Sequence, residues 1–153
     1  MESRVHIECI HKSLTSTQDE IMKSVLLVDD DNILLLGIGV RLKSMGYVVF
    51  TAKDAVSAVS AVVKNNPDVV VLDISLPAGD GFLVAGRLQN LVGSAATPII
   101  FITANENPQL RDRAAKLGAA AFLNKPFDAT TLADAIESAL SPGDYRRALA
   151  SGE

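Results

Sequence analysis

The chain has few of the features that mark secreted, membrane or nucleic-acid-binding proteins. Its single cysteine, Cys9, excludes an internal disulfide bond and a cysteine-based zinc site. No apolar run approaches the length of a membrane span, and the N-terminus lacks a signal-peptide core. The chain has no block of lysine or arginine and a net charge of -4, which gives little support to nucleic-acid binding. We therefore expect a cytoplasmic protein that binds neither nucleic acid nor a membrane.

The composition and length are those of one globular domain. The chain has 153 residues, of which 48% are hydrophobic and 21% charged, enough to bury a sizeable core. We expect the domain to span residues 24–140, preceded by a poorly ordered extension at 1–23 and followed by a tail at 141–153. An alternative for the extension is that translation begins at Met22, directly before the first strand-like segment.

Strand-like and helix-like segments alternate from residue 24 onward. The strand-like segments are short and apolar on both faces, which is typical of buried parallel strands. Strands are predicted at 24–28, 47–51, 68–72, 98–102 and 119–123. Helices are predicted at 32–45, 54–65, 80–91, 107–117 and 128–140. Because crossovers between parallel strands are right-handed, this order predicts an α/β fold with a doubly wound, five-stranded parallel sheet.

Polar residues and glycines mark the ends of several predicted helices. Gly46 and Gly118 stand where a glycine ends a helix. Acidic residues that can accept hydrogen bonds from the first turn precede the helices. The candidate N-caps are Asp54, Asp80 and Asp128. Asp31 is also expected to cap a helix or form a turn rather than take part in chemistry.

Four of the predicted strands end in polar residues suited to phosphate and a divalent cation. Asp29 and Asp30 follow the first strand and Asp73 the third, whereas Thr103 and Lys125 follow the last two. The carboxyl ends of parallel strands lie at one edge of a sheet, so these side chains should converge there. Crowded carboxylates without histidine or cysteine favour Mg²⁺, and a carboxylate can accept a phosphoryl group. The pattern predicts an aspartate that is phosphorylated with Mg²⁺.

Residues 24–140 resemble the receiver domain of the two-component response-regulator family. The matching stretches are Val25–Asp31, Val71–Phe82, Ile102–Ala104 and Gly118–Phe127. All four occur in order, and each includes the end of a predicted strand. The resemblance implies a flavodoxin-like (βα)5 receiver fold.

The resemblance also implies a role for each acid of the predicted edge. Asp73 matches the phosphoacceptor of the family and would also contact the metal. Asp30 should bind Mg²⁺ directly, and Asp29 should act mainly through water. The backbone carbonyl of Ser75 would complete the protein ligands. Mn²⁺ is a possible substitute for Mg²⁺.

Further residues match positions that bind the phosphoryl group or respond to it. Thr103 and Lys125 should bind the phosphoryl oxygens, and Ala104 is a small residue that leaves the site open. Phe122 matches the aromatic switch position, which turns inward as the Thr103 hydroxyl moves. The resemblance also implies a cis peptide bond before Pro126.

Two positions that tune the hydrolysis of the acyl phosphate hold Ser75 and Asn105. The amide of Asn105 can hydrogen-bond a water molecule but cannot act as a base, as a carboxylate could. We therefore expect an aspartyl phosphate of moderate lifetime.

The first predicted helix is apolar enough to form a contact surface. A stripe of residues spaced by about four is expected to face the sheet, namely Leu34, Ile38, Leu42 and Met45. Leu35, Leu36 and Val40 are then expected to point away and to form a docking surface for the phosphodonor. The alternative is an apolar helix that the N-terminal segment partly covers.

The resulting prediction is a stand-alone receiver that acts through protein contacts. Its phosphodonor would be a histidine kinase or a histidine phosphotransfer protein, and its effector is an unknown protein. We expect a monomer or weak homodimer that catalyses only its own phosphorylation and dephosphorylation and is not an enzyme with an external substrate.

Three other kinds of protein fit the sequence less well than a phosphorylated receiver does. A Mg²⁺-dependent phosphatase would need an acid two residues after the nucleophile, where this chain has Ser75. A flavin-binding domain would need a Ser/Thr/Gly-rich phosphate loop where this chain has Asp29–Asp31. A degenerate receiver would bind partners without phosphorylation, although the complete set of site residues gives no reason to expect one.

Overall fold

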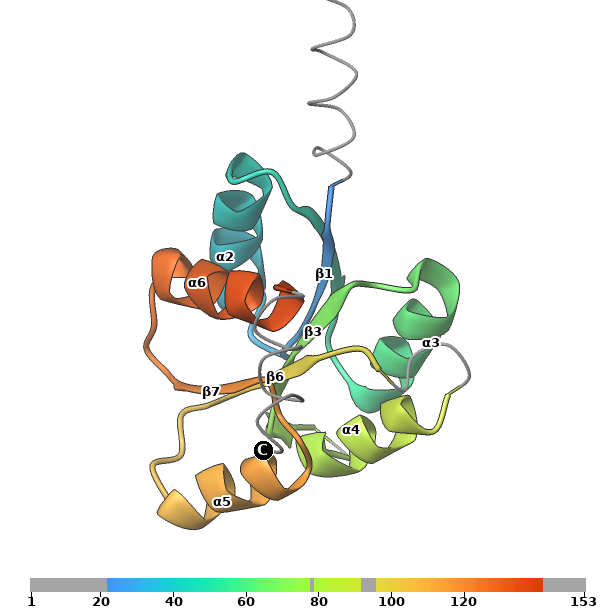
Figure 1. The fold of residues 1–153 in the computed structure, drawn as a ribbon, viewed down its shortest axis with the longest axis vertical. Coiled ribbons are helices and arrows are strands. Elements are labelled where there is room, and N and C mark those ends of the chain that lie inside the picture. The colour runs from blue at the N-terminus through green and yellow to red at the C-terminus, as the bar shows by residue number, and fades with distance from the viewer. Residues whose placement is uncertain (1–21, 78, 92–95, 142–153) are drawn as a thin grey trace, which may run out of the picture.

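The computed structural model describes residues 22–77, 79–91 and 96–141 (Figure 1). The strands are β1 (Ser24–Val28), β2 (Val48–Ala52), β3 (Val69–Asp73), β4 (Ser75–Leu76), β5 (Gly79–Asp80), β6 (Ile99–Thr103) and β7 (Ala121–Asn124). The helices are α2 (Asn32–Ser44), α3 (Ala55–Asn65), α4 (Gly81–Gln89), α5 (Pro108–Lys116) and α6 (Ala129–Leu140). Residues 1–21 of the expected extension and 142–153 of the expected tail lie outside the described residues.

The main sheet has five parallel strands in the order β2-β1-β3-β6-β7. The predicted doubly wound, five-stranded parallel sheet is therefore confirmed. The antiparallel pair β4–β5 was not predicted, because strands of two residues are too short to carry a periodic pattern. The register places Asp73 beside Ile102 and Thr103 beside Asn124, so the ends of β3, β6 and β7 are aligned.

Helices cover both faces of the sheet and enclose two apolar cores (Figure 1). Helices α2 and α6 pack on one face, where Leu42 and Ile136 join the core. Helices α3, α4 and α5 pack on the other face with residues such as Val62 and Leu88. Successive strand residues point to opposite faces, so Leu26 joins one core while Leu27 joins the other. Each fully buried side chain of this kind contributes about 1.5–3 kcal/mol of transfer free energy.

Carboxylates cap four of the helices as their positions in the sequence indicate. The predicted N-caps are confirmed because each side chain accepts a hydrogen bond from the first turn; these are Asp54, Asp80 and Asp128. Asp31 likewise accepts hydrogen bonds from the N–H groups of Ile33 and Leu34. Gly46 and Gly118 have φ of 100° and 77°, which confirms them as the left-handed residues that end α2 and α5.

Helix α2 faces the sheet differently from the prediction. Leu35, expected to point away, is only 6% exposed and packs in the core with Leu42. Gly39 lies between them on the same stripe, and its small size brings the helix close to Val49. The stripe that faces the sheet is therefore shifted from the predicted one, and Met45 is 40% exposed. The prediction for Leu35 is wrong.

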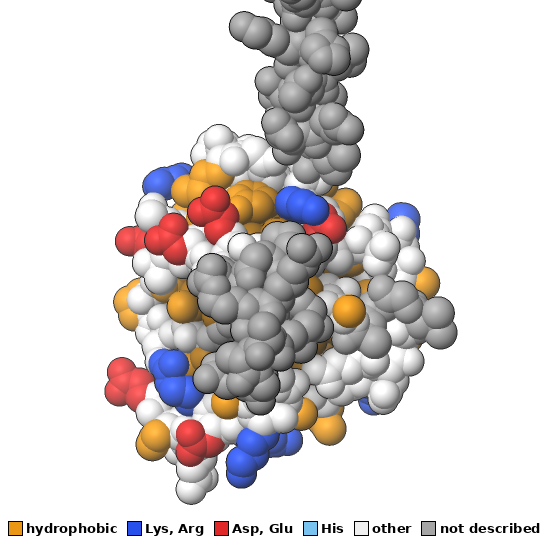
Figure 2. Space-filling model, viewed as in Figure 1, with side chains coloured by type: hydrophobic (Ala, Val, Ile, Leu, Met, Phe, Trp, Pro, Cys, Tyr) orange, Lys and Arg blue, Asp and Glu red, His pale blue; other side chains and the backbone are white. Residues whose placement is uncertain are grey.

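Charged side chains of both signs are interspersed around the periphery of the face seen in Figure 1 (Figure 2). The described residues visible on this face form no continuous patch of one charge. None of the helices in the described part of the chain is long and apolar enough to cross a membrane.

Candidate phosphoacceptor site

The end of β1 gives three consecutive acids three different environments. Asp29 is 1% exposed, and its Oδ1 accepts a hydrogen bond of 2.9 Å from the backbone N–H of Asp31. Asp30 is exposed to solvent. Asp31 caps α2. The side chain of Asp31 is thus engaged by the helix, and only Asp29 and Asp30 are available to a ligand.

The end of β3 holds Asp73 in a tightly packed turn. Asp73 is 3% exposed, and its Oδ1 accepts a hydrogen bond of 2.9 Å from the N–H of Ser75. The N–H of Gly81 donates to the carbonyl of Ile74 at 2.8 Å, which draws the start of α4 against the turn. A Cβ atom at position 81 would lie 2.6 Å from Cα of Ile74. Only glycine allows this approach, a structural role that the sequence analysis missed.

Lys125 joins the two buried acids. Its Nζ lies 2.7 Å from Oδ2 of Asp29 and 3.1 Å from Oδ2 of Asp73. Burial alone would lower the pKa of the lysine, but hydrogen bonds and attraction from the two carboxylates outweigh it, so the pKa lies above its ordinary value. The lysine is therefore a charged ammonium that partly neutralises the cluster.

The acids at this edge fit a hard divalent cation. One carboxylate oxygen from each of Asp29, Asp30 and Asp73 lies within 4.8 Å of the others. Oδ2 of Asp29 is buried and accepts no hydrogen bond of good geometry within the described residues, although it forms the ion pair with Lys125. A buried carboxylate oxygen with unused acceptor capacity suits a metal ion, and a set of oxygen ligands favours Mg²⁺. The residues present therefore fit the ion predicted from the sequence.

Thr103 ends β6 beside the strand that leads to Lys125. It is fully buried, and its hydroxyl oxygen accepts a hydrogen bond of 3.0 Å from the N–H of Asn105. Its carbonyl accepts a hydrogen bond of 2.8 Å from the N–H of Lys125. The side-chain amide of Asn124 donates to the carbonyl of Asn105 at 3.3 Å. These bonds fix the start of the loop that includes Ala104, which is exposed.

Phe122 on β7 is half-buried, and its ring packs against one core. The guanidinium of Arg111 on α5 lies over the ring, 4.8 Å from its centroid. The same guanidinium contacts the side-chain oxygen of Asn124 at 3.4 Å. Arg111 therefore ties α5 to the strand that carries the predicted switch residue, a contact that the sequence analysis missed. The peptide bond between Lys125 and Pro126 is cis.

The structure brings together most of the predicted site residues. Asp29, Asp30, Asp73 and Lys125 form one cluster, and Thr103 lies at the same edge of the sheet. Ser75 and Asn105 donate their backbone N–H groups to Asp73 and Thr103, respectively. Ligation by the Ser75 carbonyl and the roles of Ala104, Asn105 and Phe122 stay predictions. Leu35 is buried in α2 and cannot form part of a docking surface.

Comparison with known families identifies the class to which this site belongs. Residues 25–137 match the family described as the response regulator receiver domain. The chain therefore belongs to the receiver-domain family, whose members are signalling domains of two-component systems. The sheet order and the acidic cluster agree with that membership.

Curated relatives are longer than the matched region. The chain is 31% identical over 123 residues to the DNA-binding dual master transcriptional regulator RpaA of Synechocystis sp., covering 80% of this chain and 51% of RpaA. It is 31% identical over 128 residues to the transcriptional regulatory protein PdtaR of Mycobacterium tuberculosis, covering 83% and 61%. The chain thus spans less than two thirds of the length of either relative.

Solved structures of receiver domains match almost over their whole length. The chemotaxis response regulator CheY4 of Vibrio cholerae aligns with a TM-score of 0.73 and 29% identity, covering 78% of this chain and 99% of CheY4. The non-phosphorylated HemR receiver domain of Leptospira biflexa aligns with a TM-score of 0.71 and 35% identity, covering 78% and 94%.

Proposed function

We propose that Asp73 accepts a phosphoryl group from a phosphorylated histidine of a histidine kinase or histidine phosphotransfer protein. The observation that carries the proposal is the convergence of Asp29, Asp30, Asp73 and Lys125 at one edge of the sheet. In the transfer, the bond between phosphorus and the imidazole nitrogen breaks and a bond to a carboxylate oxygen of Asp73 forms. The electron pair of the broken bond stays on the imidazole, which takes up a proton from water and remains with the donor as the neutral ring.

Some residues of the site orient the carboxylate of Asp73, and others attract the negatively charged phosphoryl group. The N–H of Ser75 holds Oδ1 of Asp73, which leaves Oδ2 facing Lys125. The ammonium of Lys125 then attracts the incoming phosphoryl oxygens. Mg²⁺, or Mn²⁺ in its place, held by Asp29, Asp30, Asp73 and the Ser75 carbonyl would supply further positive charge against the negative charge of the transfer.

Phosphorylation is proposed to act by changing the contacts of the face around Thr103 and Phe122. The hydroxyl of Thr103 would leave the N–H of Asn105 to bind a phosphoryl oxygen, and Phe122 would move inward. Such a change shifts the population of two arrangements and needs no new fold. The amide of Asn105 supports an acyl phosphate of moderate lifetime.

Intact-mass measurement after incubation with acetyl phosphate and Mg²⁺ tests the proposal. We expect one phosphoryl adduct in the wild type, and none in Asp73→Asn or after chelation of the metal. Asp134→Asn, which changes an exposed acid on α6, should retain the adduct. A folded wild-type domain that binds Mg²⁺ but takes up no phosphoryl group from small donors or from phosphohistidine proteins would instead be a degenerate receiver.

Docking of the phosphodonor is proposed to use the exposed apolar residues Leu36 and Val40 of α2. They are 71% and 56% exposed, respectively. Replacing both with Ser should slow transfer from a phosphohistidine protein while leaving phosphorylation by acetyl phosphate unchanged. Equal loss in the two assays would argue against docking. The stand-alone nature of the chain and its oligomeric state stay predictions, which the mass of the native polypeptide and sedimentation would test.

A further inference from the structure

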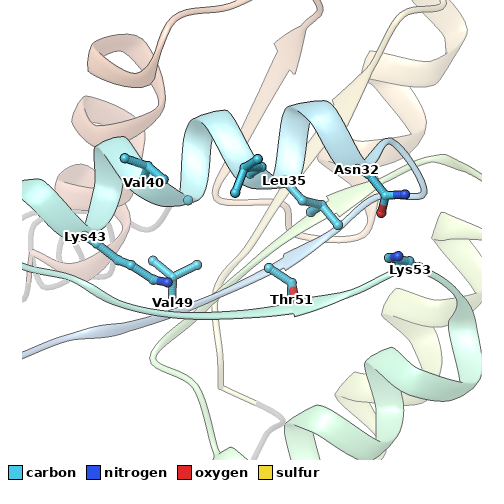
Figure 3. A pocket seen from close by; sticks show the side chains of 9 residues that line it. Asn32, Leu35, Val40, Lys43, Val49, Thr51 and Lys53 are labelled. Carbon is cyan, nitrogen blue, oxygen red and sulfur yellow. The ribbon is translucent and has the colours of Figure 1, made fainter.

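A groove of about 320 Å³ lies between α2 and β2, at the edge of the main sheet (Figure 3). Apolar side chains of the helix and the strand line its middle. Lys43 lies at one end of the groove and Lys53 at the other. The lining of the groove includes Leu36, Val40, Lys43, Val49, Thr51 and Lys53.

The backbone of β2 has unpaired hydrogen-bonding groups along this groove. The N–H of Val48 donates to Lys23, and the carbonyl of Ala52 accepts from Asp29, so alternate residues of β2 pair with β1. The N–H and C=O groups of Val49 and Thr51 therefore point away from β1. Among the described strands β2 pairs with β1 alone, which leaves those groups open to an added strand.

Helix α2 borders the groove beside β2 (Figure 3). Leu36 and Val40 lie on its outer side and line the groove together with Val49. A strand placed beside β2 would cover these apolar side chains from water. The groove therefore combines main-chain hydrogen bonds for affinity with an apolar wall for specificity, the two elements of peptide recognition by strand addition.

The charge of the groove indicates what kind of peptide it would take. No acidic residue lines it, although the whole chain has a net charge of -4. Neither Lys43 nor Lys53 forms an ion pair with another described residue. Both ammonium groups are thus free to attract carboxylates at the two ends of an apolar segment.

We propose that this groove binds an extended peptide segment with an apolar centre and acidic ends, which adds to β2 as a sixth strand of the sheet. The site is separate from Asp73, so the proposal does not depend on phosphorylation. It shares Leu36 and Val40 with the docking surface proposed for the phosphodonor. An acidic segment bound here would therefore compete with that donor.

Titration of the ¹⁵N-labelled full chain with a blocked peptide, Glu-Glu-Val-Thr-Val-Thr-Val-Glu-Glu, tests the proposal. We expect saturable shifts of groove resonances and slower hydrogen exchange at the amides of Val49 and Thr51. Lys43→Gln and Lys53→Gln should each weaken binding by about two- to fivefold, as loss of one exposed ion pair would. Thr51→Pro should weaken it further, because it removes an outward N–H that β1 does not use.

Two controls distinguish binding in the groove from non-specific electrostatic attraction between the peptide and the protein. Lys64→Gln changes a lysine in the last turn of α3, as Lys43→Gln does in the last turn of α2, and should leave affinity unchanged. A peptide with lysine in place of glutamate should not bind. Equal binding of both peptides, or unaltered exchange at Val49 and Thr51, would overturn the proposal.

Hydrogen exchange at the amides of Val49 and Thr51 in the free protein tests whether something other than an acidic peptide fills the groove. Protection that rises with protein concentration would show that a second copy fills the groove. Protection that is strong and independent of concentration would show that another segment of the same chain fills it. Either result would overturn the proposal of an acidic peptide partner.

Discussion

Lys125 holds together two carboxylates that would otherwise repel each other at the end of the sheet. Because these acids raise the pKa of the lysine, we expect Asp29→Asn and Asp73→Asn each to lower it. The pKa is higher in the folded than in the unfolded chain, whose value is about 10.5. The interaction therefore stabilises the fold below pH 10.5 and is lost as the pH rises through the folded pKa.

An NMR titration of the Lys125 side chain checks this expectation. Its pKa should be above the ordinary lysine value of about 10.5 in the wild type, and closer to that value in either variant. The same pKa in all three proteins would contradict the contacts at 2.7 and 3.1 Å.

Gly81 makes the turn after Asp73 possible because a side chain there would collide with the backbone of Ile74. We expect Gly81→Ala to lower the free energy of unfolding by about 1–3 kcal/mol, measured by urea denaturation. It should also slow phosphorylation, because the turn that positions Asp73 would shift. Gly86→Ala, in the same helix but with no atom within 4 Å of the new Cβ, should instead stabilise by about 0.5–1 kcal/mol. Equal effects of the two changes would contradict the close approach.

Single residues differed in how far the sequence could predict them. Asp29, Asp73 and Lys125 were predictable because each follows an apolar run whose strand character is plain. Leu35 was mispredicted because consecutive apolar residues in α2 give its helical period no preferred face. Gly81 stands in a recognisable motif, yet its role depends on a long-range approach to Ile74 that no local pattern contains.

Helix α5 buries little apolar surface, so we expect contacts of its arginines to help hold it against the rest of the domain. Ala114 is its one buried residue. The guanidinium of Arg113 lies 4.4 Å from the ring centroid of Phe82 and 3.7 Å from the carboxylate of Asp80. We expect Arg113→Gln to lower the free energy of unfolding by about 0.5–1 kcal/mol, mostly through loss of the cation–π contact.

Hydrogen exchange measures where this loss occurs. The amides of α5 should exchange faster in Arg113→Gln, whereas those of α6 should not change. Lys116→Gln, which changes a cation of the same helix that has no ring contact or ion pair with a described residue, serves as the control. If both variants exchange alike, the arginine does not hold the helix.

The occurrence of each strand and helix was easier to predict than the residues at which it begins and ends. The five predicted strands of the main sheet and the five predicted helices all occur, because apolar runs and capping acids mark them clearly. Four of the strands begin one or two residues later than predicted, since hydrogen bonding to a neighbouring strand decides where pairing starts. The β4–β5 pair could not be predicted because it has no more than two residues on each side.

At the scale of the molecule, the sheet order assembles the site from distant parts of the chain. Strand β1 pairs with β3, β3 with β6, and β6 with β7. Residues 29, 73, 103 and 125, which end or follow these strands, therefore lie at the same edge of the sheet. The sequence predicted the convergence because parallel strands share an edge. The sequence did not by itself give the distances between these side chains, because they depend on how the ammonium of Lys125 packs between the carboxylates of Asp29 and Asp73.

We expect the stability of the whole domain to depend on Mg²⁺, because Asp29, Asp30 and Asp73 are placed to bind it. A ligand that binds the folded chain alone stabilises it by RT ln(1 + [L]/Kd), about 1.4 kcal/mol at ten times Kd, which raises Tm by several degrees. We expect this rise in thermal unfolding of the wild type and a much smaller one in Asp30→Asn, which removes an exposed ligand without creating a buried unpaired charge. Asp134→Asn on α6 should behave as the wild type, because it changes the net charge equally but lies outside the cluster. A rise of equal size in all three proteins would place the stabilising ion elsewhere. In that case Asp29 and Asp73 would be held together by Lys125 rather than by a metal, and the proposed chemistry at Asp73 would lose its cofactor.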